Sequence, residues 1–201
     1  MIEQGSQEWH LQRVGKVTAS RLADVMATIK SGEAATRMNY KAQLVAERLT
    51  GAPTESFTSG AMQHGTEQEP IAREAYERAK GSIVEQVAFV DHPIIPMSGA
   101  SPDGLVDDGL VEIKSPNTST HIDTLLQRKI PNKYNLQMQW QMACTGRKWC
   151  DFVSFDPRLP EHLQLCVIRV PRDEDLISEC EYKVQQFLSE VDNLTSRLEK
   201  L

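Results

Sequence analysis

The first third of the chain carries apolar residues at the spacing of amphipathic helices. We expect Thr18-Ala19-Ser20 to cap the first of these helices, and Gly51 with Pro53 to end the second. Acidic residues and Pro70 occupy the predicted first turn of the third helix. The predicted helices of this part are 22–29, 40–49 and one that runs from Thr66 to near Gly81.

After Gly81 the pattern changes to short β-rich runs separated by turn-forming residues. A break at His92-Pro93 and a turn at Ser101-Pro102-Asp103-Gly104 divide the first of these runs. Strands are predicted at 83–90, 94–97, 110–114, 149–155 and 163–170, and helices at 119–126, 135–143 and 173–198. Helices that flank a central sheet indicate an α/β or α+β fold.

The chain has 201 residues, of which 40% are hydrophobic and 25% charged, so disordered and collagen-like classes are excluded. This length suits one domain, and no linker or change of composition marks a boundary; we therefore expect a single domain over residues 1–201. No apolar run approaches the roughly 20 residues that span a bilayer, and no signal peptide is evident. We expect a cytoplasmic protein without a membrane partner.

The charged groups argue against a general nucleic-acid coat protein, because 22 basic residues face 28 acidic ones for a net charge of −6. A locally basic channel on an acidic body is still compatible with this balance. The four cysteines form no CxxC pair and are expected to be small core residues. The histidines have no metal-binding spacing, and neither a catalytic-triad order nor a phosphate-binding GxxxxGK[ST] loop occurs.

The densest chemistry lies between Ser101 and Lys114. If 110–114 is a strand, Glu112 and Lys114 share one face, because side chains alternate along a strand. Asp103, from the preceding turn, brings a second carboxylate toward the same point. Two carboxylates are the ligands that Mg²⁺ prefers, and a neighbouring lysine can orient a water molecule or stabilise negative charge. These residue types are the ones that phosphodiester hydrolysis needs.

The acid-x-Lys spacing alone is not specific. With 28 acidic residues in the chain, chance produces roughly one or two such triplets. Glu181-Tyr182-Lys183 has the same spacing, but it falls in a predicted helix, where residues two apart face different sides. The alternative interpretation of Glu112 and Lys114 is an exposed charge pair beside an ordinary turn.

Four separated blocks together resemble the phage lambda-type alkaline exonucleases, also called YqaJ-like viral recombinases, of the PD-(D/E)xK nuclease superfamily. The blocks follow the family's order and extend to about residue 157. They are Trp9-His10 with Arg13-Val14-Gly15-Lys16-Val17-Thr18-Ala19-Ser20; Gly65-Thr66-Glu67-Gln68-Glu69; Ser101-Pro102-Asp103-Gly104 with Glu112-Ile113-Lys114-Ser115-Pro116; and Tyr134-Asn135-Leu136-Gln137-Met138-Gln139. The resemblance implies an α/β, restriction-endonuclease-like fold with a central mixed sheet flanked by helices.

The resemblance also implies the roles of the central residues. Asp103 and Glu112 hold the metal ions, with the backbone carbonyl of Ile113 as a further ligand, and Lys114 is the catalytic lysine. Glu69 matches an acidic position near the metal; its alternative interpretation is a first-turn helix charge.

Further positions match residues that contact substrate. Gln137 matches a residue that holds substrate or nucleophile, in competition with Gln139 and Gln141 on the same helix. Arg13, Ser20 and Ser101 match a pocket for the 5′-phosphate of a DNA end, where a guanidinium and two hydroxyl groups suit the ligand. Tyr134 is assigned to packing rather than base stacking.

As a whole, the resemblance implies a Mg²⁺-dependent exonuclease, with Mn²⁺ as a substitute, that digests linear double-stranded DNA in the 5′→3′ direction and leaves a 3′ single strand. It further implies a processive trimeric ring, with Arg128, Lys129 and Lys133 as candidate channel residues, and a single-strand annealing protein as partner, in the cytoplasm of a host that carries a phage or prophage. Two alternatives are a nicking or structure-specific endonuclease on the same fold and a catalytically inert DNA-end-binding scaffold.

Overall fold

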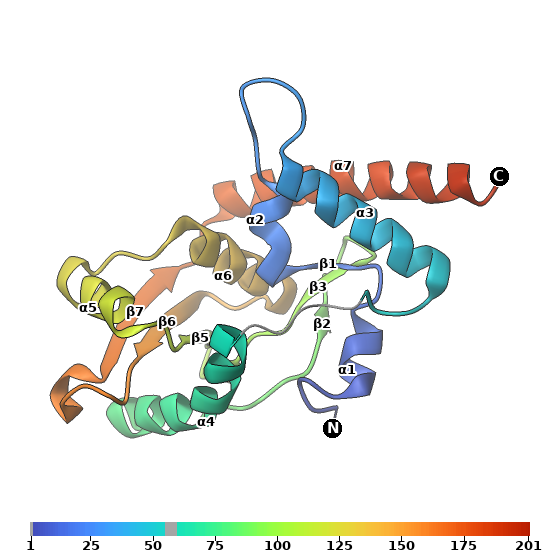
Figure 1. The fold of residues 1–201 in the computed structure, drawn as a ribbon. Helices are drawn as coiled ribbons and strands as arrows, with labels where there is room; N and C mark the ends of the chain where they lie inside the picture. Colours follow the sequence, from blue (N-terminus) through green and yellow to red (C-terminus); the bar gives the residue numbers. More distant parts are fainter. Residues whose placement is uncertain (1, 55–59) are drawn as a thin grey trace.

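The computed structural model describes residues 2–54 and 60–201. The larger of its two sheets is mixed and has four strands (Figure 1). The strand order is β4-β5-β6-β7; β5 and β6 run parallel, whereas the two outer pairs are antiparallel. Every residue of β5 except the last is buried, as expected for a strand covered on both faces. The strands are β4 (Gly104–Val106), β5 (Gly109–Lys114), β6 (Trp149–Phe155) and β7 (Leu165–Pro171).

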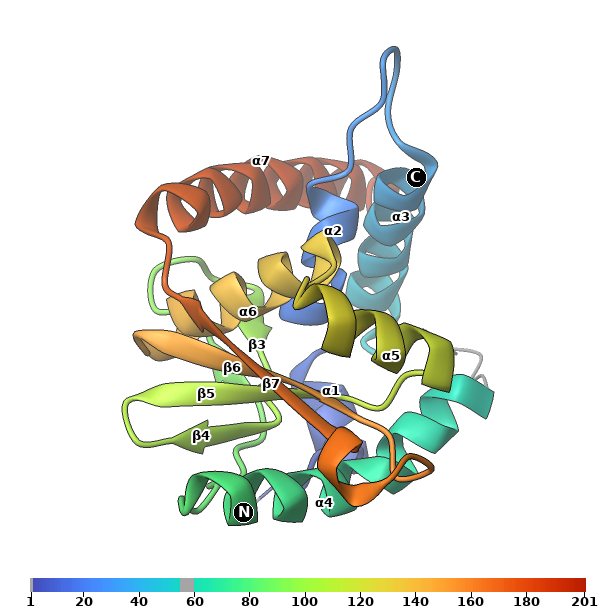
Figure 2. The ribbon, with the colours of Figure 1, turned by 90° about the vertical axis from the view of Figure 1, so that its left-hand side faces the viewer.

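Helices cover both faces of this sheet (Figure 2). The face toward α4 is an apolar cluster that includes Tyr76, Val111 and Ile113. The opposite face, toward α6, contains Leu110 and Met138 in a second cluster. Alternate residues of β5 therefore enter different layers. The covering helices are α4 (Gly60–Lys80), α5 (Thr118–Gln127) and α6 (Asn132–Thr145).

A second, three-stranded sheet lies beside the first, with the order β1-β3-β2 and a parallel β1-β3 pair. Its core joins residues of the N-terminal helices, α6 and the C-terminal helix in one apolar cluster around Tyr40, Trp140 and Phe187. The elements of this part are α1 (Gln7–Gln12), β1 (Val17–Thr18), the 3-10 helix η1 (Ala19–Arg21), α2 (Leu22–Val25), α3 (Ala35–Thr50), β2 (Val90–Asp91), β3 (Ser98–Ala100) and α7 (Glu174–Leu198). The short 3-10 helix η2 (Glu161–Leu163) precedes β7.

Ion pairs join α3 to α7 at the edge of this core. Arg37 and Lys41 each approach the carboxylate of Glu190 to 2.8 Å. Both basic groups also pair with Glu33, which precedes α3. The hydrogen bond from Arg37, helped by the one from Lys41, lowers the pKa of Glu190 to about 2 against the opposing effect of partial burial. This network stabilises the ionised carboxylate in the folded state.

Most helix predictions are confirmed, and two need correction. The helix predicted from Thr66 begins at Gly60, so Pro70 lies inside α4 rather than in its first turn; a proline removes one backbone donor, which a long packed helix can tolerate. The helix predicted over 22–29 ends at Val25, and Ile29 is exposed instead of extending the apolar stripe. The predictions at 40–49, 119–126, 135–143 and 173–198 correspond to α3, α5, α6 and α7.

The strand predictions at 110–114, 149–155 and 163–170 are confirmed by β5, β6 and β7, whereas the two earlier ones are wrong. Within 83–90, Glu85 makes an isolated bridge to Leu105, and only Val90 enters a ladder. Residues 94–97 form a turn, because the Nδ1 atom of buried His92 accepts hydrogen bonds from the backbone N–H groups of Ile94 and Ile95. A local side-chain acceptor thus competes with strand pairing.

The four cysteines are buried and carry free thiols, as expected from their spacing. Among the described residues, no cluster of three or more His, Cys, Asp or Glu side chains is arranged as a metal site. No helix in the described ranges is long and apolar enough to span a bilayer.

Candidate active site at the centre of the mixed sheet

The β4-β5 hairpin brings the two predicted carboxylates together. Gly104 pairs with Val111, so Asp103, directly before β4, lies across from Glu112 on β5. The carboxylate of Asp103 accepts a hydrogen bond of 2.6 Å from the backbone N–H of Ile113. Gly104, next in the chain, lets the side chain of Val84 pack against this turn, because a Cβ atom there would lie 2.0 Å from Cγ1 of Val84.

Glu112 and Lys114 lie on the same face of β5, as the alternation predicts. Glu112 is fully buried, and the ammonium of half-buried Lys114 forms an ion pair with its Oε1 atom. The same ammonium lies 5.4 Å from the ring centroid of Tyr134, which stacks on Phe152. Tyr134 therefore packs under the lysine, in agreement with its assignment to packing.

Two glutamines of α6 complete the surroundings of the Glu112 carboxylate. Nε2 of Gln137 donates to Oε1 and Nε2 of Gln141 donates to Oε2, each at 2.6 Å. Gln139, the third candidate on this helix, instead bonds the backbone of Pro171 and Asp173 on another side. The structure thus places Gln137 beside the carboxylate, and it adds Gln141, one helical turn further along the same face.

Glu69 lies near this group on α4. Its pKa is raised first by burial and also by the charge of Glu112, while Arg73 and Lys114 act in the opposite direction. An ion pair of 3.3 Å joins Glu69 to Arg73 one turn further along α4. The side chain is therefore a third carboxylate in the field of the candidate site, with a cation of its own.

Burial and neighbouring charges shift the pKa values of Asp103 and Lys114. Burial raises the pKa of Asp103 well above its usual range, and the charges of Glu112 and Glu69 add to the effect. Burial works to lower the pKa of Lys114, but the negative charges of Glu112 and Asp103 outweigh it and the pKa is raised. Lys114 is therefore charged at neutral pH, and it balances only part of the negative charge.

This donor set fits a divalent cation with a preference for oxygen ligands. Asp103 and Glu112 supply carboxylate oxygens, and the backbone carbonyl of Ile113 lies between Glu112 and Lys114 in the chain. A cation placed at these oxygens would compensate the burial that mainly raises the pKa of Asp103, and it would relieve the repulsion from Glu112 and Glu69 that adds to the shift. The residues thus satisfy the oxygen-ligand requirement of Mg²⁺ or Mn²⁺.

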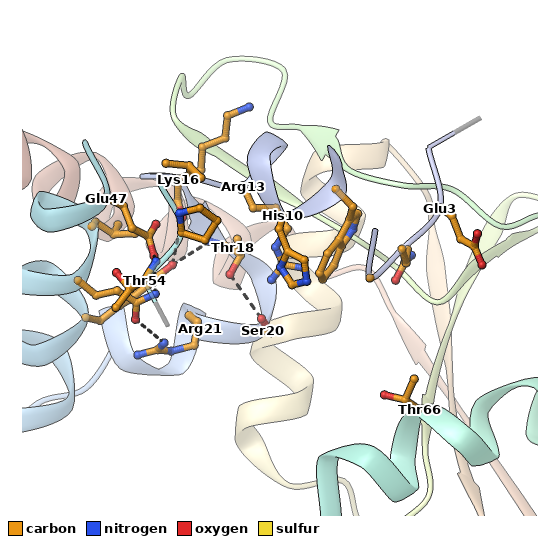
Figure 3. A pocket seen from close by; sticks show the side chains of 18 of the residues that line it. Glu3, His10, Arg13, Lys16, Thr18, Ser20, Arg21, Glu47, Thr54 and Thr66 are labelled. Atoms are coloured by element: carbon orange, nitrogen blue, oxygen red, sulfur yellow. Dashed lines mark hydrogen bonds between the residues drawn. The ribbon is translucent and has the colours of Figure 1, made fainter. Parts of the chain in front are cut away.

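Two of the three residues predicted to bind a terminal phosphate lie at a neighbouring cavity of about 690 Å³ (Figure 3), and the third, Ser101, is outside its lining. Arg13 and Ser20 line this cavity, and the guanidinium of Arg13 lies over the ring of Trp9, 3.8 Å from its centroid. The indole Nε1 of Trp9 donates to Oγ of Ser101 at 2.9 Å. Trp9, to which sequence reasoning assigns no role, therefore connects Arg13 with the loop that carries Asp103.

The cavity also reaches one of the three carboxylates of the candidate site, Glu69. Glu69 and Thr66 of α4 belong to its lining, and Figure 3 shows Thr66 on the wall across from Arg13. Burial lowers the pKa of Arg13, although nearby Tyr40 and Glu47 oppose the shift. Among the described residues, no carboxylate forms an ion pair with Arg13. A half-buried cation without a paired carboxylate, in the lining of a cavity, suits an anionic ligand.

A second arginine that lines the cavity, Arg21, already has protein partners for its guanidinium. Arg21 lies over the ring of Tyr40 at 4.2 Å and bonds Asp24 at 2.5 Å and Gln43 at 3.0 Å. It resembles Arg13 in stacking on an aromatic ring but differs in having a carboxylate partner. The comparison singles out Arg13 as the arginine left to bind a ligand.

The predicted channel residues separate into two kinds. Arg128 has its guanidinium turned back to β7, where it donates to Cys166 and to the carbonyl of Val167. Lys129 and Lys133 are exposed, and the ammonium of Lys133 lies 4.7 Å from the ring centroid of Tyr134, close to Lys114. Of the three residues, Lys133 is the one placed beside the candidate site.

Comparisons with known proteins identify the relatives of this chain. Residues 8–148 match the family described as the YqaJ-like viral recombinase domain. The structure of LHK-Exo in complex with dAMP is 51% identical, with a TM-score of 0.91 and 97% of each chain covered. The structure of an alkaline exonuclease (LHK-Exo) from Laribacter hongkongensis is 50% identical, with a TM-score of 0.90 over the same share of each chain.

A more distant neighbour shares the fold. The structure of a phage related exonuclease from Haemophilus somnus 129PT has a TM-score of 0.75 at 17% identity, and the match covers 91% of this chain and 96% of that chain. No curated protein matches the sequence. The expected mixed sheet flanked by helices is therefore confirmed by the structure and by its neighbours.

Proposed function

Because the chain belongs to the YqaJ-like viral recombinase family, we propose that it is a metal-dependent exonuclease of linear double-stranded DNA, acting from 5′-phosphorylated ends. The observation that carries this proposal is the convergence of Asp103, Glu112 and Lys114 next to a cavity that holds Arg13. The relationship to an alkaline exonuclease at 50% identity supports it. The similar protein LHK-Exo has been solved in complex with dAMP. This ligand is a deoxynucleoside monophosphate, which is the kind of product that an exonuclease releases from DNA.

Asp103, Glu112 and the backbone carbonyl of Ile113 would hold the metal, which we propose to be Mg²⁺ with Mn²⁺ as a substitute. When bound, such a cation polarises the scissile phosphoryl group and lowers the pKa of a water molecule. Glu69 contributes a further negative charge to the site. Its ion pair with Arg73 limits its ability to hydrogen-bond water molecules that a metal ion would carry.

Lys114 supplies a fixed positive charge at the reacting phosphate. Because Glu112 and Asp103 keep its ammonium protonated, its role is to stabilise negative charge that develops during hydrolysis and to orient the attacking water by donating hydrogen bonds. Tyr134 and Glu112 hold the ammonium in place. Gln137, half-buried beside Glu112, has an amide within reach of the same region and assists in holding the nucleophile or substrate.

Arg13, Ser20 and Ser101 form the proposed subsite for the 5′-phosphate. A guanidinium offers paired donors that match phosphate oxygens, and hydroxyl groups add further donors. The Trp9 ring below Arg13 and its bond to Ser101 keep two of these groups in one arrangement. A strand end anchored there would have its first phosphodiester bonds near Asp103, two residues beyond Ser101.

We propose that the whole chain acts as one nuclease domain. The family relationship further supports 5′→3′ processive digestion that leaves a 3′ single strand, a homotrimeric ring around the DNA, transfer of the strand to a single-strand annealing protein, and work in the cytoplasm of a phage-carrying host. The proposed channel residues are Lys133, exposed beside the site, and Lys129, which is also exposed.

The test uses linear duplex DNA with a 5′-phosphate and a separate label at each end, with a covalently closed circle alongside. We expect Mg²⁺-dependent loss of nucleotides from the 5′ ends, an intact circle, and no reaction in the presence of a chelator. Cutting of the circle would replace the exonuclease with an endonuclease. Binding of DNA without any cleavage would identify an inert end-binding scaffold.

A further inference from the structure

We infer that Gln141 is a positioning residue: it fixes the inner oxygen of the Glu112 carboxylate so that the outer oxygen is presented to the metal. This inference rests on the proposed function, since it assigns Glu112 to metal binding. It concerns a side chain to which the sequence gives no specific role, because Gln137, Gln139 and Gln141 are equivalent in the sequence pattern.

The two oxygens of Glu112 have different surroundings. Oε1 contacts Lys114 and Gln137, which are both partly exposed, so this oxygen faces the open side of the site. Oε2 accepts a bond of 2.6 Å from Nε2 of Gln141, which is fully buried. Gln141 therefore holds the carboxylate from the protein interior, where no cation or substrate has to enter.

The orientation of the Gln141 amide follows from hydrogen-bond chemistry. An ionised carboxylate only accepts hydrogen bonds, so the NH₂ group must point to Glu112 and the amide oxygen must point away. The amide oxygen of Gln141, its Oε1 atom, is buried and has no hydrogen-bond partner in the part of the chain that the structure describes. The side chain thus leaves one acceptor unsatisfied in order to donate to Glu112. Such an arrangement favours the carboxylate at the expense of stability, as is common at functional sites.

The same geometry separates the work of the two glutamines. Gln137 shares Oε1 with Lys114, and its contact lies where metal and DNA must approach. Gln141 donates to the other oxygen, Oε2, from the buried side. Loss of Gln141 should therefore act on metal affinity, whereas loss of Gln137 should act mainly on turnover of DNA.

The experiment measures Mn²⁺ binding to the full chain without DNA, from the rise in Tm as Mn²⁺ is titrated. The stabilisation follows RT ln(1 + [Mn²⁺]/Kd), and the Mn²⁺ concentration equal to the fitted Kd is the midpoint of binding. Gln141→Met keeps the length of the side chain but removes the donor, and Gln141→Asn keeps the amide but shortens its reach. For both variants we expect the Mn²⁺ concentration at the midpoint to increase roughly tenfold to a hundredfold, as is usual when a ligand loses its supporting partner. If Gln141→Met does not fold, the inference is tested by comparing the Mn²⁺ midpoint of Gln141→Asn with that of the wild type.

Gln139→Met is the matched control, because Gln139 is also a buried glutamine of α6 with hydrogen bonds on both amide atoms. It should lower the Tm without metal but leave the Mn²⁺ midpoint unchanged. Equal midpoints for wild type and both Gln141 variants would overturn the inference while leaving the metal site intact. A wild-type protein whose Tm does not respond to Mn²⁺, although it cleaves DNA only with Mn²⁺, would also overturn it, because Glu112 would then not hold metal before DNA binds. Absence of both response and cleavage would refute the proposed function itself.

Discussion

Arg13, in the lining of the cavity, gives the most specific prediction about substrate choice. Replacing Arg13 by Met removes the guanidinium and keeps an unbranched side chain over the ring of Trp9. If Arg13 binds the terminal phosphate, the variant should lose its preference for phosphorylated 5′ ends. Activity on ends that carry a 5′-hydroxyl group should change little, because the missing contact is not made with them.

The size of the effect follows from the surroundings of Arg13. No carboxylate in the described part of the chain pairs with it, and burial lowers its pKa, so its donors are available and only partly hydrated. A hydrogen bond to a charged group contributes about 1.5–3 kcal/mol. Because 1.4 kcal/mol corresponds to a factor of ten, kcat/KM on phosphorylated ends should fall roughly 10- to 150-fold.

The assay compares initial rates on two otherwise identical duplexes, one with a 5′-phosphate and one with a 5′-hydroxyl group. Arg21→Met is the matched control, because Arg21 lines the same cavity and stacks on Tyr40 but is already paired with Asp24. It should affect both substrates equally. A similar loss on both substrates for Arg13→Met, or an end-specific loss for Arg21→Met, would refute the assignment.

Three further predictions concern the frame of the site. Gly104→Ala places a Cβ atom 2.0 Å from Cγ1 of Val84 and should lower the free energy of unfolding by about 1–3 kcal/mol; an unchanged urea midpoint would contradict this. Tyr76→Phe removes a 2.9 Å hydrogen bond to the fully buried carboxylate of Asp151 and should cost about 1–3 kcal/mol in urea unfolding, whereas no loss would mean that solvent replaces the hydroxyl group. Glu190, whose pKa falls from 4.5 to about 2 on folding, stabilises the protein above pH 4.5 and loses this contribution as the pH falls toward 2. The decrease in Tm caused by Glu190→Gln should therefore be largest at neutral pH and should vanish as the pH approaches about 2. A decrease in Tm that is independent of pH would contradict this linkage.

The chemistry of the site is largely local in sequence, and that part could be predicted. Alternation along β5 is enough to put Glu112 and Lys114 on one face, and a tight turn is enough to bring Asp103 back to them. The triplet at Glu181 is excluded by the same kind of argument, since it lies within α7. Sequence periodicity carries information of this kind over a few residues.

The remaining features depend on how distant elements pack. The hydrogen bond between Trp9 and Ser101 joins residues 92 positions apart, so the periodicity of the sequence cannot predict it. The direction in which α6 presents its glutamines is set by its packing on the sheet, so only the structure separates Gln141 from Gln139. Pro70 inside α4 shows how tertiary packing overrides a strong local signal for a helix start.

The most direct test of the central claim compares Lys114→Met with Lys183→Met in the rate of nucleotide release from linear, 5′-phosphorylated duplex DNA with Mg²⁺. Both lysines follow a glutamate by two positions, but only Lys114 stands beside the carboxylate pair. We expect Lys114→Met to lose activity by a factor of roughly 100 or more while its circular dichroism spectrum is preserved, and Lys183→Met to digest DNA at the wild-type rate. Wild-type digestion by a folded Lys114→Met variant would contradict the proposed site.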